Sequence, residues 1–180
     1  MGLLRAIATV GGFTLISRIL GFVRDILIAA ILGAGVLADV FFVAFKIPNF
    51  FRRLFAEGAF AQAFVPILGE YREQGSQAAV RSLISRVSGT LGLTLLLFTL
   101  VIVLAAPAMA AIFAPKWFFN DPLKFTATAE MLRITFPYLM FISMTGVAGG
   151  ILNSYDRFAV PAFTPILLNI SLIAAALIAA

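Results

Sequence analysis

Residues 39–68 read DVFFVAFKIPNFFRRLFAEGAFAQAFVPIL, a stretch that is apolar and aromatic enough for a lipid bilayer. It nevertheless carries the charged residues Asp39, Lys46, Arg52, Arg53 and Glu57. A charged side chain at the centre of a membrane helix costs about 2.5–3.5 kcal/mol on insertion scales. If this stretch crosses a membrane, its charges need a polar environment within the protein, and they mark a candidate functional site.

The composition of the whole chain is that of a membrane protein. Of its 180 residues, 62% are hydrophobic and 12% are charged, and the mean hydropathy is +1.09. Soluble domains are about 45–50% apolar and about 25% charged, so lipid must cover part of this apolar surface. The sequence contains no Cys and no His, which excludes disulfides, thiolate zinc sites and Ser-His-Asp triads. We expect no metal, no cofactor and, because no binding signature accompanies the net charge of +5, no nucleic acid.

Apolar runs and turn residues divide the chain into five predicted membrane helices. A bilayer core takes about 20 apolar residues, and three charge-free runs reach that length. The runs near the N-terminus are shorter, so we join them across their charges into two long helices, the second bent near Pro48. The predicted helices cover residues 3–32, 37–68, 87–107, 130–153 and 158–180, with loops at about 70–86 and 108–128. The fold class is an all-α membrane protein, a polytopic bundle of transmembrane helices.

The distribution of Lys and Arg predicts the orientation of these helices. With the N-terminus inside, the inside segments contain Arg5, Arg72, Arg81, Arg86 and Arg157, and the outside segments contain Lys116 and Lys124. Cytoplasmic segments carry the excess of basic residues, so we expect a cytoplasmic N-terminus.

The first apolar run has no cleavage site and is expected to be retained. Because no anchoring residue flanks the last apolar run, we expect the chain to be the front part of a longer protein.

The charges of the first two helices form a polar stripe. Residues seven apart lie nearly on one helix face, which joins Asp39 to Lys46 and Arg53. Arg53 also has Glu57 four residues on, so its charge can be used within the helix. Arg52 points about 100° away from Arg53 and has no such partner, so we expect it to be available to a ligand.

The charge balance of the stripe indicates an anion-binding cavity. The basic residues Arg18, Arg24, Lys46, Arg52 and Arg53 exceed the acidic residues Asp25, Asp39 and Glu57 by two charges. The planar fork of arginine suits bidentate binding of phosphate oxygens. We therefore predict that Arg18, Arg24 and Arg52 line a water-filled cavity. The alternative is that single arginines extend to lipid headgroups or mark an interfacial helix.

Three polar residues of the later helices are predicted to make hydrogen bonds between helices. They are Asn153, Asn169 and Ser171.

Three segments resemble the MurJ (MviN) family of lipid II flippases. They are SRILGFVRD at 17–25, ADVFFVAFKIPNFFRRLFAEGAFAQAFVPIL at 38–68, and FPYLMFISMTGVAGGILNSYDRFAVPAFTPILLNIS at 136–171. The run K-I-P-N-x-x-R-R-x-F-A-E-G at 46–58 is the most specific of these signals. The resemblance implies a fold of the multidrug/oligosaccharidyl-lipid/polysaccharide exporter type. This chain would then supply five helices of the N-terminal lobe, with further C-terminal helices in the same protein.

The resemblance also implies a transport function without covalent catalysis. Members of the family move lipid II, the undecaprenyl-diphosphate-linked peptidoglycan precursor, from the cytoplasmic to the periplasmic leaflet of the bacterial inner membrane, by alternating access. Arg18, Arg24 and Arg52 match positions that contact the diphosphate, and Ser17 and Asp25 match neighbours that orient these arginines. Asp39 matches a position near the periplasmic gate and Glu57 one near the cytoplasmic side, and the supporting residues are Lys46, Asn49 and Arg53. The implied partners are lipid II and membrane lipids. The fragment alone is expected to be inactive.

Three other functions compete with this interpretation. One is a structural membrane protein, which gives no reason for the stripe of charges. An exporter of a different polyprenyl-linked glycan would share the cationic cavity, whereas an exporter of organic cations should have an acidic one. A membrane-embedded enzyme acting on prenyl phosphates commonly needs paired aspartates or a histidine. Asp25 and Asp39 are isolated in the sequence and His is absent, so the residues favour a transporter.

Overall fold

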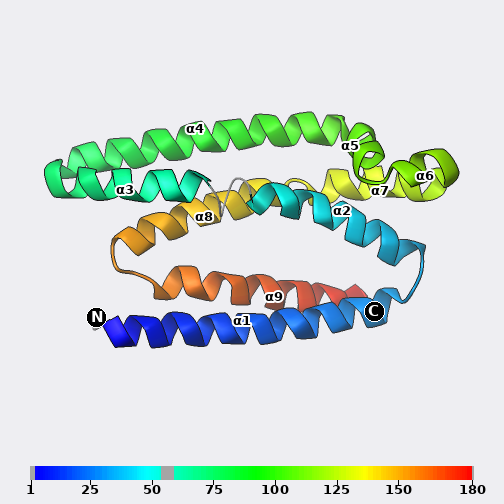
Figure 1. Ribbon diagram of the computed structural model, residues 1–180, viewed down its shortest axis with the longest axis horizontal. Helices are drawn as coiled ribbons and strands as arrows, with labels where there is room; N and C mark the ends of the chain where they lie inside the picture. Colours follow the sequence, from blue (N-terminus) through cyan, green and yellow to red (C-terminus); the bar gives the residue numbers. More distant parts are fainter. Residues whose placement is uncertain (1–2, 54–58, 180) are drawn as a thin grey trace. The chain divides into compact units, whose positions relative to one another are not determined.

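The computed structural model describes residues 3–53 and 59–179, which form helices joined by short connections (Figure 1). The helices are α1 (Leu3–Leu32), α2 (Val36–Arg52), α3 (Ala59–Gln74), α4 (Gln77–Leu104), α5 (Ala106–Phe113), α6 (Pro115–Asn120), α7 (Pro122–Thr135), α8 (Tyr138–Ser154) and α9 (Ala159–Ala179). No β-strand occurs within these two ranges. The predicted all-α fold class is therefore confirmed.

Three helical segments of the described chain are long and apolar enough to cross a membrane. They are Gln77–Leu104, Pro122–Ser154 and Ala159–Ile178, with mean hydropathies of 2.4, 1.5 and 1.9. Only 17%, 22% and 11% of the residues in their apolar windows are buried inside the structure. Most residues of these windows are therefore not buried within the structure, as expected of a multi-pass membrane protein.

The helices form two compact units, Met1–Ala38 with Ile151–Ala180 and Asp39–Gly150. In the first unit, α1 and α9 lie side by side along most of their length (Figure 1). Their apolar contact includes the rings of Phe13 and Phe163, which meet edge to face with centroids 5.6 Å apart. Pairing with α9 thus covers one side of α1.

The second unit packs around one cluster of buried apolar side chains. The cluster consists of Ile47, Leu95, Ile102, Ala106, Leu132, Phe136 and Leu139. The ring of Phe51 joins it, with centroids 5.2 Å from Phe98 and 5.8 Å from Phe136. Pro48 lies inside α2 and is fully buried beside this cluster's Ile47. Burial in this packed core, rather than the polar stripe, therefore anchors α2.

The segment 70–86, predicted as a loop, is mostly helical. The helices α3 and α4 run through it and are joined at residues 75–76. Ser76 caps α4 by accepting a hydrogen bond from the backbone N–H of Ala79 (3.2 Å). Gly75 is needed because a Cβ there would lie 2.5 Å from the carbonyl oxygen of Tyr71. Charged residues end an apolar span but do not end a helix, since helix hydrogen bonds are made within the backbone.

The segment 108–128 also contains helices where a loop was predicted. It holds the end of α5, all of α6 and the start of α7. Pro107, Pro115 and Pro122 stand in the first turns of these three helices. Proline is accommodated there because the first backbone N–H groups of a helix have no partner within it. The predicted helix 37–68 is covered by α2 and α3, and residues 54–58 between them lie outside the described residues.

Candidate functional site

A buried amide on α9 connects two of the predicted site residues of α1. Asn169 is 6% exposed. Its Nδ2 donates to the backbone carbonyl of Ser17 (2.9 Å) and to the hydroxyl oxygen of Ser17 (3.3 Å). Its Oδ1 accepts from Nη1 of Arg24 (2.8 Å). Gly21 packs against this amide, and a Cβ there would lie 3.7 Å from Nδ2, an ordinary van der Waals distance. The prediction that Asn169 makes hydrogen bonds between helices is confirmed.

Arg24 is held from a second side by the neighbouring carboxylate. Its Nε and Nη2 donate to Oδ1 of Asp25, at 3.0 and 2.8 Å. The Arg24 side chain is 22% exposed and that of Asp25 is 66% exposed. A guanidinium has five N–H donors, and these contacts with Asp25 and Asn169 use one on each nitrogen. Arg24 therefore has a fixed orientation, and two of its donors are not used by these contacts.

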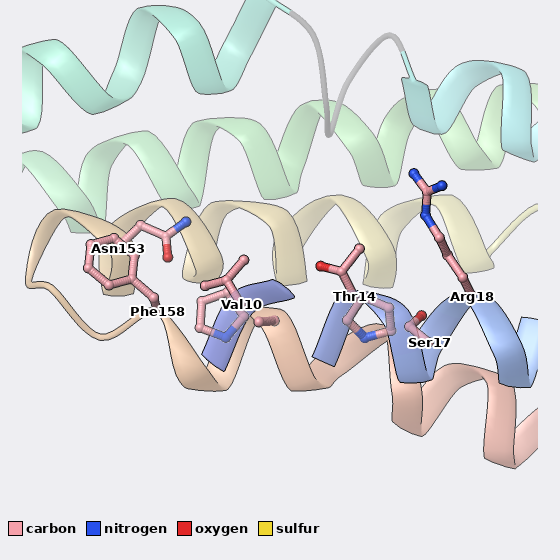
Figure 2. Close-up of a pocket in the computed structure, with 9 residues that line it drawn as sticks. Val10, Thr14, Ser17, Arg18, Asn153 and Phe158 are labelled. Atoms are coloured by element: carbon pink, nitrogen blue, oxygen red, sulfur yellow. The ribbon is translucent and has the colours of Figure 1, made fainter. Parts of the chain in front are cut away.

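Arg18 stands at the end of a pocket of about 360 Å³ between α1, the end of α8 and α9. The pocket is lined by Val10, Thr14, Ser17, Arg18, Asn153, Phe158, Pro161, Ala162 and Pro165. The side chain of Arg18 extends away from α9 (Figure 2). It is exposed, and it makes no hydrogen bond or ion pair within the described part of the chain. Arg18 thus presents its guanidinium outward, whereas Arg24 is held against α9.

The stripe of charged residues seven positions apart begins on α2 and ends at Arg53, just after this helix. Asp39, Lys46 and Arg53 are all exposed. The opposite face packs into the second unit through Val40, Ala44 and Ile47, which are between 0% and 1% exposed. The helical period therefore separates the charges of α2 from its core contacts, as the spacing predicts.

Arg52 has a partner that its sequence position did not suggest. Its Nε donates to Oδ1 of Asn49, three residues earlier, at 2.8 Å. Both side chains are half-buried. The sequence predicted no charged partner for Arg52, and the structure gives it a neutral one, because an i, i+3 neighbour reaches it on the same face of the helix. The availability of Arg52 to a ligand stays a prediction. Asn49 fixes the direction of the Arg52 side chain and leaves Arg53 exposed.

Asp39 pairs with a lysine far away in the sequence. Oδ2 of Asp39 accepts from Nζ of Lys124 at 2.7 Å, which ties the start of α2 to the start of α7 within the second unit. The side chain of Lys124 is 21% exposed and that of Asp39 is 53% exposed. Nζ of Lys124 also lies 5.6 Å from the centre of the Trp117 ring. The distribution of basic residues places Lys124 in a predicted outside segment, and the sequence predicts no site role for this lysine.

Within each unit, the structure brings some of the predicted residues together. In the first unit Ser17 and Arg24 contact Asn169, and Asp25 contacts Arg24. In the second unit Asn49 contacts Arg52. Lys46 and Arg53 lie on the exposed stripe, and Glu57 lies outside the described residues. The residues that were not assigned to the site are Asn169 and Lys124. A polar amide inside the apolar run 158–180 was the available signal for Asn169.

Replacing Asn169 tests how strongly α9 holds α1. Asn169→Ala is expected to destabilise the folded protein by about 1 kcal/mol, since hydrogen bonds between membrane helices are worth about 0.6–2 kcal/mol. The measurement is thermal unfolding of the full-length protein in detergent. Ser171→Ala is the matched control, because Ser171 lies on the same helix but is exposed. Equal stability of the two variants would show that the Asn169 amide does not connect the helices.

Comparisons with known proteins agree with the sequence motifs. A family model described as lipid II flippase MurJ matches residues 28–180. The chain is 50% identical over 177 residues to a protein of Vibrio cholerae serotype O1 named probable lipid II flippase MurJ, covering 95% of this chain and 34% of that protein. It is 45% identical over 180 residues to the lipid II flippase MurJ of Burkholderia cenocepacia, covering 100% of this chain and 35% of that protein. The chain thus spans about a third of the length of these relatives.

Proposed function

The chain belongs to the lipid II flippase MurJ family, and from this premise we propose that the full-length protein moves lipid II across the bacterial inner membrane. The direction is from the cytoplasmic to the periplasmic leaflet, and the mechanism is alternating access of two lobes to one cavity. The relatives are named as flippases, which are transporters and carry out no covalent chemistry on their cargo. The distribution of Lys and Arg supports a cytoplasmic N-terminus.

The observation that carries the proposal is the fixed guanidinium of Arg24. Asn169 and Asp25 hold it from two sides, and donors remain on its nitrogens for a ligand. A diphosphate accepts several charge-assisted hydrogen bonds and so competes with the single oxygen of Asp25 for Nε and Nη2. In this proposal Asp25 is the counter-ion of the empty site, and the exposed Asp25 side chain turns away when the diphosphate binds.

Each of the other predicted arginines is also proposed to contact the diphosphate. Arg18 presents an exposed guanidinium from the same helix as Arg24. Arg52 comes from α2, where Asn49 fixes its direction. The remaining lobe of the protein supplies the other wall of the cavity. For that reason residues 1–180 alone are proposed to be inactive.

The proposal is tested in cells that depend on this protein for lipid II transport. The full-length protein replaces the resident flippase, and a lipid II-cleaving enzyme added on the periplasmic side measures how much lipid II has crossed. The expected result is growth and cleavage at the level of the resident protein. If growth is not restored but a different polyprenyl-linked glycan reaches the periplasm, the protein exports that glycan instead. Arg24→Ala is expected to abolish cleavage while membrane expression is kept.

The pair of Asp39 and Lys124 is proposed to hold a gate position, and charge exchange tests this role. Asp39→Lys or Lys124→Asp alone places like charges together and is expected to reduce lipid II transport severalfold. The double variant carrying both changes restores opposite charges and is expected to recover most of the transport. Arg81→Asp serves as the control, since Arg81 is exposed on α4 and has no proposed role in the gate. Failure of the double variant to recover would show that each residue acts separately.

A further inference from the structure

The connection between α4 and α7 exposes large apolar side chains. These are Ile112, Phe118, Phe119 and Leu123, which are 65%, 50%, 75% and 77% exposed. The short helix α6 in this connection has no buried residue. A connection that extends into water is usually polar, since nothing offsets the hydration of exposed apolar surface there. The connection therefore has an apolar surface that needs a partner.

The position of the connection limits what this partner can be. It joins two of the segments that can cross a membrane, Gln77–Leu104 and Pro122–Ser154. The ends of such segments lie where the acyl chains meet the headgroups. Leu104, in the last turn of α4, is 72% exposed, and Leu123, in the first turn of α7, is 77% exposed. The apolar surface of the connection is thus continuous in sequence with the outward-facing surface of both segments.

Several contacts hold the connection in place. The ring of Phe118 meets the rings of Phe119 and Phe125 edge to face, with centroids 5.0 and 5.2 Å apart. Asp121 caps α7 by accepting a hydrogen bond from the backbone N–H of Lys124 (3.1 Å). The Lys124 ammonium in turn pairs with Asp39, at 2.7 Å. These contacts order the apolar side chains before a partner arrives, which lowers the entropy lost on binding.

The residue types of the connection match the membrane interface. Trp and aromatic rings are enriched where headgroups meet acyl chains, and lysines extend from there to phosphates. Trp117 lies beside the Lys124 ammonium, and Lys116 is exposed. We propose that residues 115–123 lie in the interfacial layer of the membrane. Phe118, Phe119 and Leu123 enter the outer acyl region, and Lys116 faces the lipid phosphates. This inference is independent of the proposed transport function.

The test places an environment-sensitive fluorophore on the connection. Phe119→Cys in the full-length protein, with cysteines elsewhere replaced, is labelled and reconstituted into vesicles of zwitterionic and anionic phospholipids. Emission is measured with nitroxide lipids labelled near the headgroup, with nitroxide lipids labelled near the chain end, and with aqueous iodide. Interfacial helices bury their apolar face about 5–10 Å below the headgroups, so we expect about twofold stronger quenching by the shallow nitroxide than by the deep one.

Two further variants make the test specific. Leu123→Cys repeats the measurement at a second exposed position in case the first variant does not fold. Gln77→Cys, at the opposite end of α4 among exposed polar residues, is the control and is expected to respond mainly to iodide. Iodide quenching of position 119 as strong as that of position 77 would place the connection in water and overturn the proposal. Protection from every quencher would show that protein covers the connection. Stronger quenching by the deep nitroxide would show that the connection inserts more deeply. Either result also overturns the proposal.

Discussion

A full-length protein carrying Arg18→Lys is expected to move lipid II about tenfold more slowly than the unchanged protein, although lysine keeps the positive charge. Hydrogen bonds to charged groups are worth about 1.5–3 kcal/mol. Lysine presents a point donor where arginine presents a planar fork, so one or more of these bonds to the diphosphate is lost. The effect should be large at Arg18 because its guanidinium is exposed and extends away from α9 (Figure 2).

The same substitution at Arg24 is expected to have two consequences. Lys at this position loses the paired contact with Asp25 as well as the contact with Asn169. Transport should therefore fall at least as far as in Arg18→Lys, and thermal stability should fall too. Arg81→Lys is the matched control, because Arg81 is exposed on α4 and has no proposed role in the site.

The measurement is periplasmic cleavage of lipid II in cells that contain only the variant flippase, with membrane expression checked first. Transport at the unchanged rate by both Arg18→Lys and Arg24→Lys would refute the forked contacts. In that case the arginines would only create a positive potential in the cavity.

The second large effect is expected at Arg52. Arg52→Ala should abolish transport, whereas Arg53→Ala should leave at least half of it. Asn49 directs the half-buried Arg52, while Arg53 lies on the exposed stripe with Asp39 and Lys46. Complementation of a flippase-depleted strain separates the two variants, because they remove the same charge from adjacent positions.

Asn49→Ala provides an internal check on this assignment. Loss of the 2.8 Å contact should weaken transport without abolishing it, since the guanidinium remains but is less ordered. If Arg53→Ala were lethal and Arg52→Ala were tolerated, the proposed facing of α2 would be wrong. If Asn49→Ala transported normally while Arg52→Ala did not, Arg52 would act without support from Asn49.

Much of the helical framework could be predicted from the sequence because its causes are local. Apolar runs of sufficient length determined the all-α membrane fold, and the seven-residue spacing placed Asp39, Lys46 and Arg53 on one exposed face of α2. The segments 70–86 and 108–128 were predicted as loops because charges and prolines were taken to end helices. In the structure the charges stay on helices α3 and α4, and the prolines begin α5, α6 and α7. Hydropathy reports where an apolar run ends, whereas backbone hydrogen bonds determine where a helix ends.

Which residues carry charge is evident from the sequence, whereas the partners of those charges depend on the tertiary structure. Arg24 pairs with its neighbour Asp25, but its second contact is to Asn169, which is 145 residues away. Asp39 meets Lys124 across 85 residues. A helix period places side chains on a face but does not specify which other helix covers that face. That choice depends on how the apolar surfaces of α1 and α9, or of α2 and α7, fit together. Polar groups removed from water add stability only where this packing brings a partner within hydrogen-bond distance.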